Sequence, residues 1–268
     1  MPDFAVNLSM LFTEVPLADR FSAAAEHGFS KVEIQFPYEL PAAQILDLLR
    51  QNKQQLVLLN APAGDWLAGD RGIACHPDKI AECRQGISLA IDYAKQLNCK
   101  NINILSGISP ADYDENIVKK TFIDNLKFCA EACAKEDIQL LAEAINTQDI
   151  PGFFLNNSRQ AFELFRAVGH TNIKLQYDIY HMQIMEGNLI QTLRNNLDKI
   201  GHIQFADVPG RHEPQTGELN FINIFKALDD MGYSGITSLE YNPSASTAES
   251  LCWLNTDRSE ERRVGNEC

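Results

Sequence analysis

Four consecutive strand-like segments in the second half of the chain end in oxygen-bearing side chains, those of Glu143, Asp178, Gln204 and Glu240. Glu143 interrupts the apolar run of residues 139–146. An ionised carboxylate in such a setting is costly unless a cation or hydrogen-bond donors meet it, so a partner is expected. Three carboxylates and an amide, without cysteine, form the hard oxygen set that suits Mg²⁺ or Mn²⁺.

An ion held by these four side chains would keep two octahedral positions open. A substrate with adjacent carbonyl and hydroxyl oxygens fills both, and the ion stabilises the enediolate formed when a proton leaves the carbon between them. The pattern therefore indicates aldose–ketose isomerisation. For any single carboxylate the alternative is an arginine partner or a capping role, but the four in register favour the metal site.

Three residues close to this set are further candidates for substrate binding. His181 follows Asp178 by three positions, and it either bonds a substrate oxygen or donates to a backbone carbonyl. Arg211 and His212 follow the seventh predicted strand, so they line the same mouth or belong to a solvated loop. Glu33, in the second half of an early strand, is expected to form hydrogen bonds near that mouth.

The loop after residue 60 is long for a connection, and it carries Trp66 and Arg71 among several glycines. Such a loop is typical of a lid that shields a reactive intermediate from water. Arg71 would then bring a positive charge to a substrate carboxylate. The alternative is a static loop on the rim of the fold, with Trp66 as its anchor.

Eight strand-then-helix units must position these side chains. The apolar strand-like segments are expected at residues 4–9, 31–36, 55–60, 101–105, 139–146, 173–180, 202–208 and 236–241, each followed by an amphipathic helical pattern. Eight units predict an α/β fold with a single closed (β/α)₈ barrel in residues 1–254, and a doubly wound open sheet is the alternative. In a barrel the carboxyl ends of the strands converge on one face, which brings the four oxygen-bearing side chains together.

Composition narrows the class of partner. The formal net charge of −13 repels phosphate backbones and anionic membranes, so neither nucleic acid nor a membrane is an expected partner. The seven cysteines form no CxxC pair, which argues against a disulfide framework and is most consistent with a reducing cytosol. No apolar run approaches membrane-spanning length. Residues 255–268 are polar and charged, and they are expected to form a tail outside the fold.

Several motifs together resemble the hydroxypyruvate isomerase family, and the resemblance covers about residues 3–254. They are residues 7–14, 62–66 with 72–74, 178–188 and 211–214. This resemblance implies a xylose-isomerase-like barrel with a divalent metal at Glu143, Asp178, Gln204 and Glu240. It also implies that Glu143 and Glu240 are the two acid/base residues.

Two positions depart from the family pattern. Residues 242–245 read Asn-Pro-Ser-Ala where the family commonly has lysine and then Pro-Arg-Gly, and Ala144 replaces a frequent proline. The first departure removes a basic contact to a substrate carboxylate. The substrate therefore stays open between hydroxypyruvate and a four-carbon 2-oxo acid of the 2-oxo-tetronate type.

The leading hypothesis is an isomerase that interconverts hydroxypyruvate and 2-hydroxy-3-oxopropanoate through a cis-enediolate, with Glu143 and Glu240 shuttling the proton. A hydride shift is the mechanistic alternative. A metal-dependent hydrolase such as a barrel endonuclease is a remote one, because its sites are rich in histidine and its substrate is anionic. A sugar-acid binding protein without catalysis is the remaining class.

Overall fold

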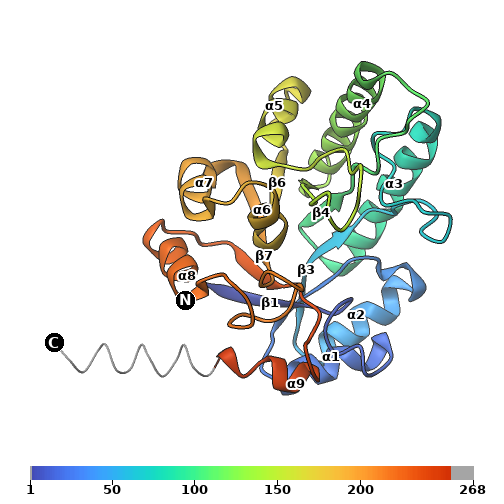
Figure 1. Ribbon diagram of the computed structural model, residues 1–268. Coiled ribbons are helices and arrows are strands. Elements are labelled where there is room, and N and C mark those ends of the chain that lie inside the picture. Colours follow the sequence, from blue (N-terminus) through green and yellow to red (C-terminus); the bar gives the residue numbers. More distant parts are fainter. Residues whose placement is uncertain (1, 255–268) are drawn as a thin grey trace.

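Eight parallel strands close into one barrel, as the alternating pattern predicts (Figure 1). The protein was analysed as a computed structural model, which describes residues 2–254, so the tail expected at 255–268 lies outside the described residues. The strands are β1 Asp3–Asn7, β2 Lys31–Ile34, β3 Gln55–Asn60, β4 Asn101–Ile104, β5 Gln139–Glu143, β6 Ile173–Asp178, β7 Ile200–Phe205 and β8 Ile236–Leu239. Each strand pairs with the next, and β8 pairs with β1 to close the barrel.

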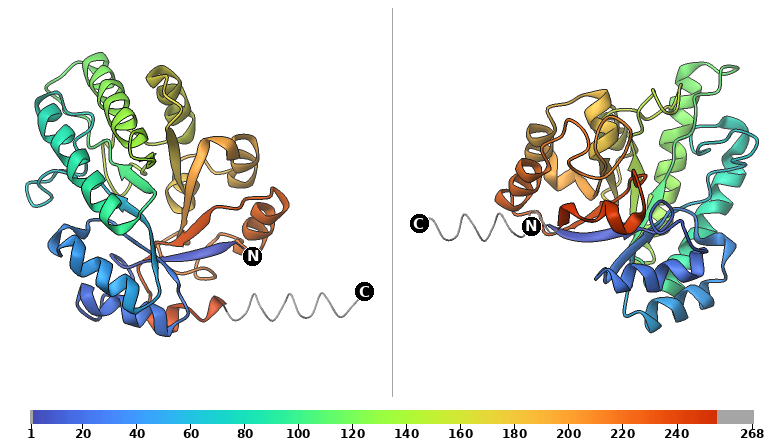
Figure 2. Two further views of the ribbon diagram at one scale, coloured as in Figure 1. Left: turned by 180° about the vertical axis from the view of Figure 1, so that it is seen from behind. Right: turned by 60° about the horizontal axis from the view of Figure 1, so that its bottom comes forward.

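Helices surround the strands on the outside of the barrel (Figures 1 and 2). They are α1 Leu17–Glu26, α2 Ala42–Gln51, α3 Ile80–Leu97, α4 Glu115–Ala134, α5 Ser158–Val168, α6 Ile179–Met185, α7 Leu189–Asn196, α8 Phe221–Asp230 and α9 Thr247–Ser250, with short 3₁₀ turns η1 Pro37–Glu39, η2 Pro77–Lys79 and η3 Leu197–Lys199. Each long helix turns an apolar stripe inward. Capping residues in the sequence set the ends of the helices, as α5 illustrates. Asn157 caps α5 by accepting a hydrogen bond from the Gln160 amide, and Gly169 ends it at φ 67°.

Strand β6 is shorter than its apolar run predicts. It ends at Asp178 rather than at residue 180, because the Asp178 carboxylate accepts a hydrogen bond from the Tyr180 amide at 2.9 Å and caps α6. Helix α6 is absent from the sequence-based expectation, since the apolar pair Ile179 and Tyr180 reads as a continuation of the strand. The cap places Asp178 at the boundary between strand and helix, at the mouth of the barrel.

An aromatic cluster packs α8 and the segment after α9 against β1 and β7. Its members are Phe4, Phe205, Phe221, Phe225 and Trp253, with ring centroids 5.2–6.0 Å apart. Edge-to-face contacts of this kind add to the burial of the rings. The cluster links β1 to β7, the two strands on either side of β8, through α8 and Trp253. Within residues 2–254, no helix combines the length and the apolar character that crossing a bilayer would need.

Candidate active site

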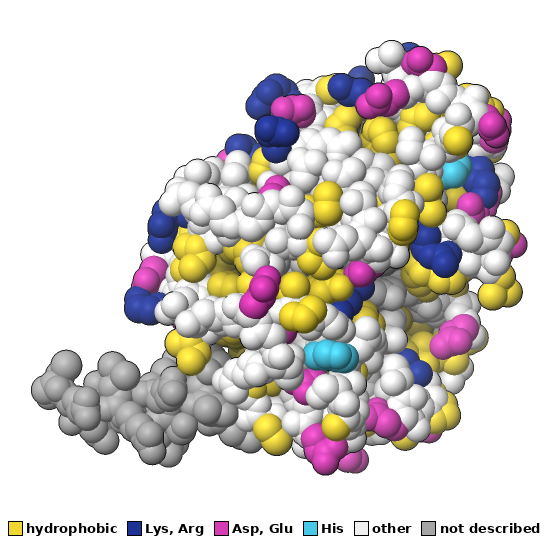
Figure 3. Space-filling model, in the orientation of Figure 1, with side chains coloured by type: hydrophobic (Ala, Val, Ile, Leu, Met, Phe, Trp, Pro, Cys, Tyr) yellow, Lys and Arg dark blue, Asp and Glu magenta, His cyan; other side chains and the backbone are white. Residues whose placement is uncertain are grey.

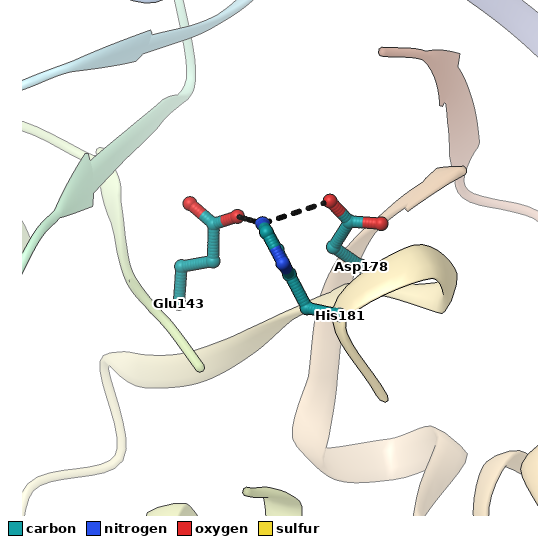
Figure 4. A group of neighbouring side chains, drawn as sticks. All are labelled: Glu143, Asp178 and His181. Atoms are coloured by element: carbon teal, nitrogen blue, oxygen red, sulfur yellow. Dashed lines mark ion pairs between the residues drawn. The ribbon is translucent and has the colours of Figure 1, made fainter. Parts of the chain in front are cut away.

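Three carboxylates converge at the carboxyl ends of the strands. Glu143 is the last residue of β5, Asp178 is the last residue of β6, and Glu240 directly follows β8. All three are buried, with exposed fractions of 5%, 0% and 2%. Figure 4 shows that His181, on the first turns of α6, points between Glu143 and Asp178. Ligand atoms of Glu143, Asp178 and His181 lie within 4.8 Å of one another, close enough for one ion.

Each of the first two carboxylates has one oxygen held by the protein and one directed toward the shared centre. Glu143 Oε2 accepts a hydrogen bond from Asn103 Nδ2 at 3.1 Å, and Asp178 Oδ1 is occupied by the helix cap. The remaining oxygens, Glu143 Oε1 and Asp178 Oδ2, lie 3.7 and 3.4 Å from His181 Nε2. The supporting bonds therefore decide which oxygens are available to a ligand.

The third carboxylate is held more firmly. Glu240 Oε1 accepts hydrogen bonds from three amide groups, Asn7 Nδ2 at 2.9 Å, Gln35 Nε2 at 2.9 Å and Gln204 Nε2 at 3.0 Å. Three donors saturate this oxygen. Oε2 is the only oxygen of Glu240 that remains for a cation or a proton, and it contacts Arg211 Nη2 at 2.6 Å.

Gln204 lies beside the carboxylates, but its amide oxygen is turned away from them. Its Nε2 donates to Glu33 Oε1 at 2.7 Å as well as to Glu240, while its Oε1 accepts a hydrogen bond from Gln176 Nε2 at 2.6 Å. The two neighbouring carboxylates favour this orientation, because each needs a donor. A metal-ligand role for Gln204 requires the amide to rotate its oxygen out of the barrel interior.

Glu33 is part of the same hydrogen-bond network. Its Oε1 accepts hydrogen bonds from Asn7 and Gln204, and its Oε2 lies 2.8 Å from His202 Nε2. Sequence reasoning expected Glu33 to bond near the mouth, but it did not find Asn7, Gln35 or His202. The available signal was an amide at the carboxyl end of an early strand, since Asn7 is the last residue of β1.

His181 presents a hydrogen-bond donor to the centre. Asn146 Oδ1 accepts from the amides of Gln148 and Asp149, so its Nδ2 group faces His181 and donates to Nδ1 at 2.7 Å. Nε2 of the neutral ring must then carry the proton. Burial, together with the charge of Arg211, holds the pKa of His181 well below its usual value, which keeps the ring neutral. This tautomer suits a bond to a substrate oxygen better than metal ligation.

Arg211 supplies the positive charge of the site. Its Nη2 contacts Glu240 Oε2 and lies 3.4 Å from Asp178 Oδ2, and its guanidinium carbon lies 5.2 Å from the centroid of the Tyr180 ring. Burial opposes the charge, but Glu240 and Asp178 outweigh burial and raise the pKa of Arg211. Its Nε is buried and has no partner among the described residues, so one N–H group is available for a ligand.

One arginine does not balance three carboxylates. Burial raises the pKa of Glu240 to about 8 and that of Asp178 to about 6, and Arg211 only partly offsets it. Burial, with the charges of Glu240 and Asp178, raises the pKa of Glu143 well above its usual value. A buried cluster of carboxyls that one arginine does not balance fits a hard divalent cation. Glu143 and Asp178 lie close enough together to hold one, and Glu240 is beside them, linked to Asp178 through Arg211.

The loop that carries Arg211 is built around Asp207. This buried carboxylate accepts hydrogen bonds from four backbone amides, those of Val208, Gln215, Gly217 and Leu219. The Arg211 backbone has φ 57°, and its carbonyl accepts a hydrogen bond from the Asn242 amide at 2.8 Å. The loop is therefore fixed at its base and against the segment after β8.

Replacing Asp207 with asparagine is expected to lower kcat/KM about tenfold and to cost about 1–3 kcal/mol of stability. The variant loses the charge, and its NH₂ group faces backbone donors that need an acceptor. Steady-state kinetics and thermal unfolding measure both effects. Asp198→Asn, in the turn η3, is the control. Full kcat/KM in Asp207→Asn would mean that the loop does not depend on this carboxylate.

The remaining predicted substrate-binding residues lie apart from the carboxylates. His212 Nδ1 lies 2.7 Å from the Asn242 carbonyl oxygen, which ties it to the segment after β8. The Arg71 guanidinium stacks 4.2 Å from the Trp66 ring centroid and donates to the carbonyls of Trp66 and Asp70. Trp66 is 46% exposed and lies 5.8 Å from the Phe36 ring. None of these contacts tests the substrate-binding roles predicted for His212, Arg71 and Trp66, so these roles stay predictions.

A sequence profile described as "Xylose isomerase-like TIM barrel" matches residues 21–256. The chain belongs to this family. Among its relatives is a protein named hydroxypyruvate isomerase from Escherichia coli strain K12, 47% identical, with the alignment covering 95% of this chain and 99% of the relative. A protein named 2-oxo-tetronate isomerase from Cupriavidus necator is 44% identical, with 95% and 98% covered. The prediction of an isomerase of the xylose isomerase-like family is therefore confirmed.

Solved structures agree on the fold. A crystal structure from Brucella melitensis, named as an AP endonuclease of family 2, superimposes on this xylose isomerase-like barrel with a TM-score of 0.93 at 40% identity, covering 96% of this chain and 99% of that one. A structure of L-ribulose 3-epimerase gives a TM-score of 0.78 at 19% identity, covering 100% of this chain and 99% of that one. At that identity the second likeness shows the fold alone.

Proposed function

We propose that this protein is a divalent-metal-dependent isomerase that interconverts hydroxypyruvate and 2-hydroxy-3-oxopropanoate. The observation that carries the proposal is that Glu143 and Asp178 each turn one oxygen toward a shared centre, while Arg211 Nη2 links Asp178 Oδ2 to Glu240 Oε2 beside it. The names of the relatives support the reaction class. Mg²⁺ or Mn²⁺ held by Glu143, Asp178 and Glu240, and by Gln204 once its amide has rotated, would stabilise negative charge on adjacent substrate oxygens.

The chain's own residues divide the remaining work. Glu143 and Glu240 lie on opposite sides of Asp178 in the barrel order, and they act as the base and acid that move a proton between adjacent carbons. Their raised pKa values favour both roles near neutral pH. His181 Nε2–H donates to a substrate oxygen. Arg211, with its unpaired Nε–H, binds a substrate oxygen or carboxylate.

Substrate identity is tested with a panel of three- and four-carbon 2-oxo acids, followed by NMR in the presence of Mg²⁺. We expect hydroxypyruvate to be converted fastest. Faster conversion of a four-carbon acid would favour the 2-oxo-tetronate alternative, which the relative from Cupriavidus necator and the missing basic residue after Tyr241 both support. No conversion of any member would contradict the isomerase proposal. Spectra recorded in D₂O test the mechanism, because product without deuterium would contradict the proton shuttle.

One observation favours a hydrolase, namely the name of the Brucella melitensis structure. The formal net charge of −13 argues against a hydrolase of nucleic acid, because it repels the phosphate backbone. On the face shown in Figure 3, acidic side chains are spread over the surface and no broad basic region is visible among the described residues. Residues 2–254 also contain one cluster of three or more metal-ligating side chains, whereas abasic-site endonucleases of this fold use several metals. If the protein cleaved an abasic DNA duplex in the presence of Mg²⁺, the hydrolase would be favoured over the isomerase.

We infer that the protein acts in the cytoplasm on a small molecule. Five cysteines, Cys75, Cys83, Cys99, Cys129 and Cys133, are buried free thiols. Free thiols in this number suit a reducing compartment.

We further propose that the loop after β3 closes over the bound substrate. Its tip is held together by the Arg71–Trp66 stack, and its base is held by Asp70, which accepts a hydrogen bond from the Asp65 amide and pairs with Lys79. The tip can therefore move as a unit.

In a Trp253→Phe background, Mg²⁺ with substrate is expected to change Trp66 emission and its access to quenchers. Arg71→Ala is expected to raise KM about tenfold, because a charged contact to the substrate carboxylate is lost. Trp253 is 3% exposed and packed among phenylalanines, so the background variant keeps the aromatic cluster. Unchanged emission together with unchanged KM would show a static loop.

A further inference from the structure

Arg211 occupies the two carboxylate oxygens that a cation bound to Asp178 and Glu240 would need. Three amides saturate Glu240 Oε1, and the α6 cap engages Asp178 Oδ1. The oxygens left over are Glu240 Oε2 and Asp178 Oδ2. Arg211 Nη2 lies 2.6 Å from the first and 3.4 Å from the second.

A guanidinium group and a divalent ion compete for these oxygens. Mg²⁺ binds oxygen at about 2.0–2.1 Å, so an N–H group in contact with the same oxygen would face the ion at like-charge contact. The Arg211 side chain is only 20% exposed, and at such a site the repulsion is weakly screened by solvent. Binding of the ion therefore requires the guanidinium to move.

The side chain moves rather than its loop. Asp207 fixes the loop through four backbone amides, and the Arg211 carbonyl is bonded to Asn242. The ring of Tyr180 offers a face along which the guanidinium can slide. Once Nη2 leaves the carboxylates, it joins Nε, which already has no partner among the described residues, and the two N–H groups form a fork that fits a carboxylate.

We propose that Arg211 is a resident counter-ion that the divalent cation displaces from Glu240 and Asp178, and that the displaced guanidinium then binds the substrate. This inference rests on the proposed metal-dependent function. It assigns an order in which the metal binds before the substrate. It also implies that Arg211 lowers the affinity of the empty site for metal, because the ion must first break the contact with Glu240.

The test is a titration of Mn²⁺ into the protein without substrate, followed by electron paramagnetic resonance or calorimetry. Arg211→Met is expected to bind Mn²⁺ about tenfold more tightly than wild type, because the competing cation is gone and no predicted metal ligand is lost. Arg71→Met is the matched control, since it removes the same charge from the loop after β3, where Arg71 contacts Trp66 and Asp70 and no carboxylate of the site. Its Mn²⁺ affinity is expected to change less than twofold.

A second variant tests the competition directly. In Arg211→Ala, guanidinium chloride far below denaturing concentration is expected to weaken Mn²⁺ binding, whereas an equal concentration of NaCl is not. The wild-type protein is expected to show no difference between the two salts. Circular dichroism confirms that both variants are folded.

The outcomes separate this inference from the proposed function. Mn²⁺ binding by wild type with equal or weaker binding by Arg211→Met would overturn the counter-ion role and leave the metal site intact. A wild-type protein that binds no Mn²⁺ would overturn both together. A control variant Arg71→Met that binds as tightly as Arg211→Met would also overturn the inference, because general charge would then explain the gain.

Discussion

A Glu240→Gln variant is expected to lose roughly 100-fold or more of kcat while it keeps its fold. The three amide donors around Oε1 demand an acceptor, so the oxygen of the new amide must stay there. Its NH₂ group then takes the place of Oε2, where it faces Arg211 and any bound cation. The substitution would remove the proposed base and would also turn a proposed metal ligand into a donor.

The metal-free melting temperature of Glu240→Gln is expected to rise. Burial raises the pKa of Glu240 to about 8 and Arg211 only partly offsets it. Near neutral pH the unfolded chain ionises this carboxyl freely and the folded state does not, so Glu240 lowers the stability of the folded state. Glu218→Gln is the control, because it removes the same charge from an exposed position in the loop after β7. Wild-type turnover by a folded Glu240→Gln protein would remove Glu240 from the acid/base pair.

Chelation of divalent metal is expected to reduce activity by roughly 1000-fold, and added Mg²⁺ or Mn²⁺ is expected to restore it. Activity that survives exhaustive chelation would contradict the metal site. The affinity for metal is expected to rise with pH through the window set by the pKa values of Asp178 and Glu240, about 6 and about 8, because the ion must displace protons from these carboxyls.

The stability of the metal-free protein should follow the opposite trend. Both carboxyls have folded pKa values above their usual values of 3.8 and 4.5, so the folded state binds more protons than the unfolded state in this window. Stability then falls as pH rises from about 4 to about 8. Saturating Mg²⁺ is expected to remove this fall. Thermal unfolding across the window, with and without Mg²⁺, measures the difference. A metal-free stability that rises with pH would contradict the burial of these charges.

The fold was predictable because each strand and helix carries its own local signal. Apolar strands that alternate with amphipathic helices permit few architectures, and eight such units match one barrel. The carboxylates were also predictable from a local signal. A charged side chain inside an apolar strand requires a cation or hydrogen-bond donors as its partner. The end of β6 was not, because Ile179 and Tyr180 are as apolar as a strand. Only the side-chain cap formed by Asp178 shows that a helix begins there.

The orientation of the amides could not be predicted. Gln204 has the residue type and the position of a metal ligand, but its direction depends on Gln176 and Glu33, which lie far away in sequence. Asn7 and Gln35 look like ordinary polar residues at the ends of strands. Their role follows from the closure of the barrel, which brings both onto Glu240.

Closure of the barrel brings residues that are synthesised early into contact with residues that are synthesised last. Asn7 and Gln35 emerge early from the ribosome, whereas their acceptor Glu240 is separated from them by 233 and 205 residues. A nascent chain that ends before β8 has two of the three carboxylates and an open sheet edge on β1. It lacks Glu240, the last residue of the proposed ligand set. Metal binding at the proposed site would therefore begin only after the last strand, β8, has been synthesised.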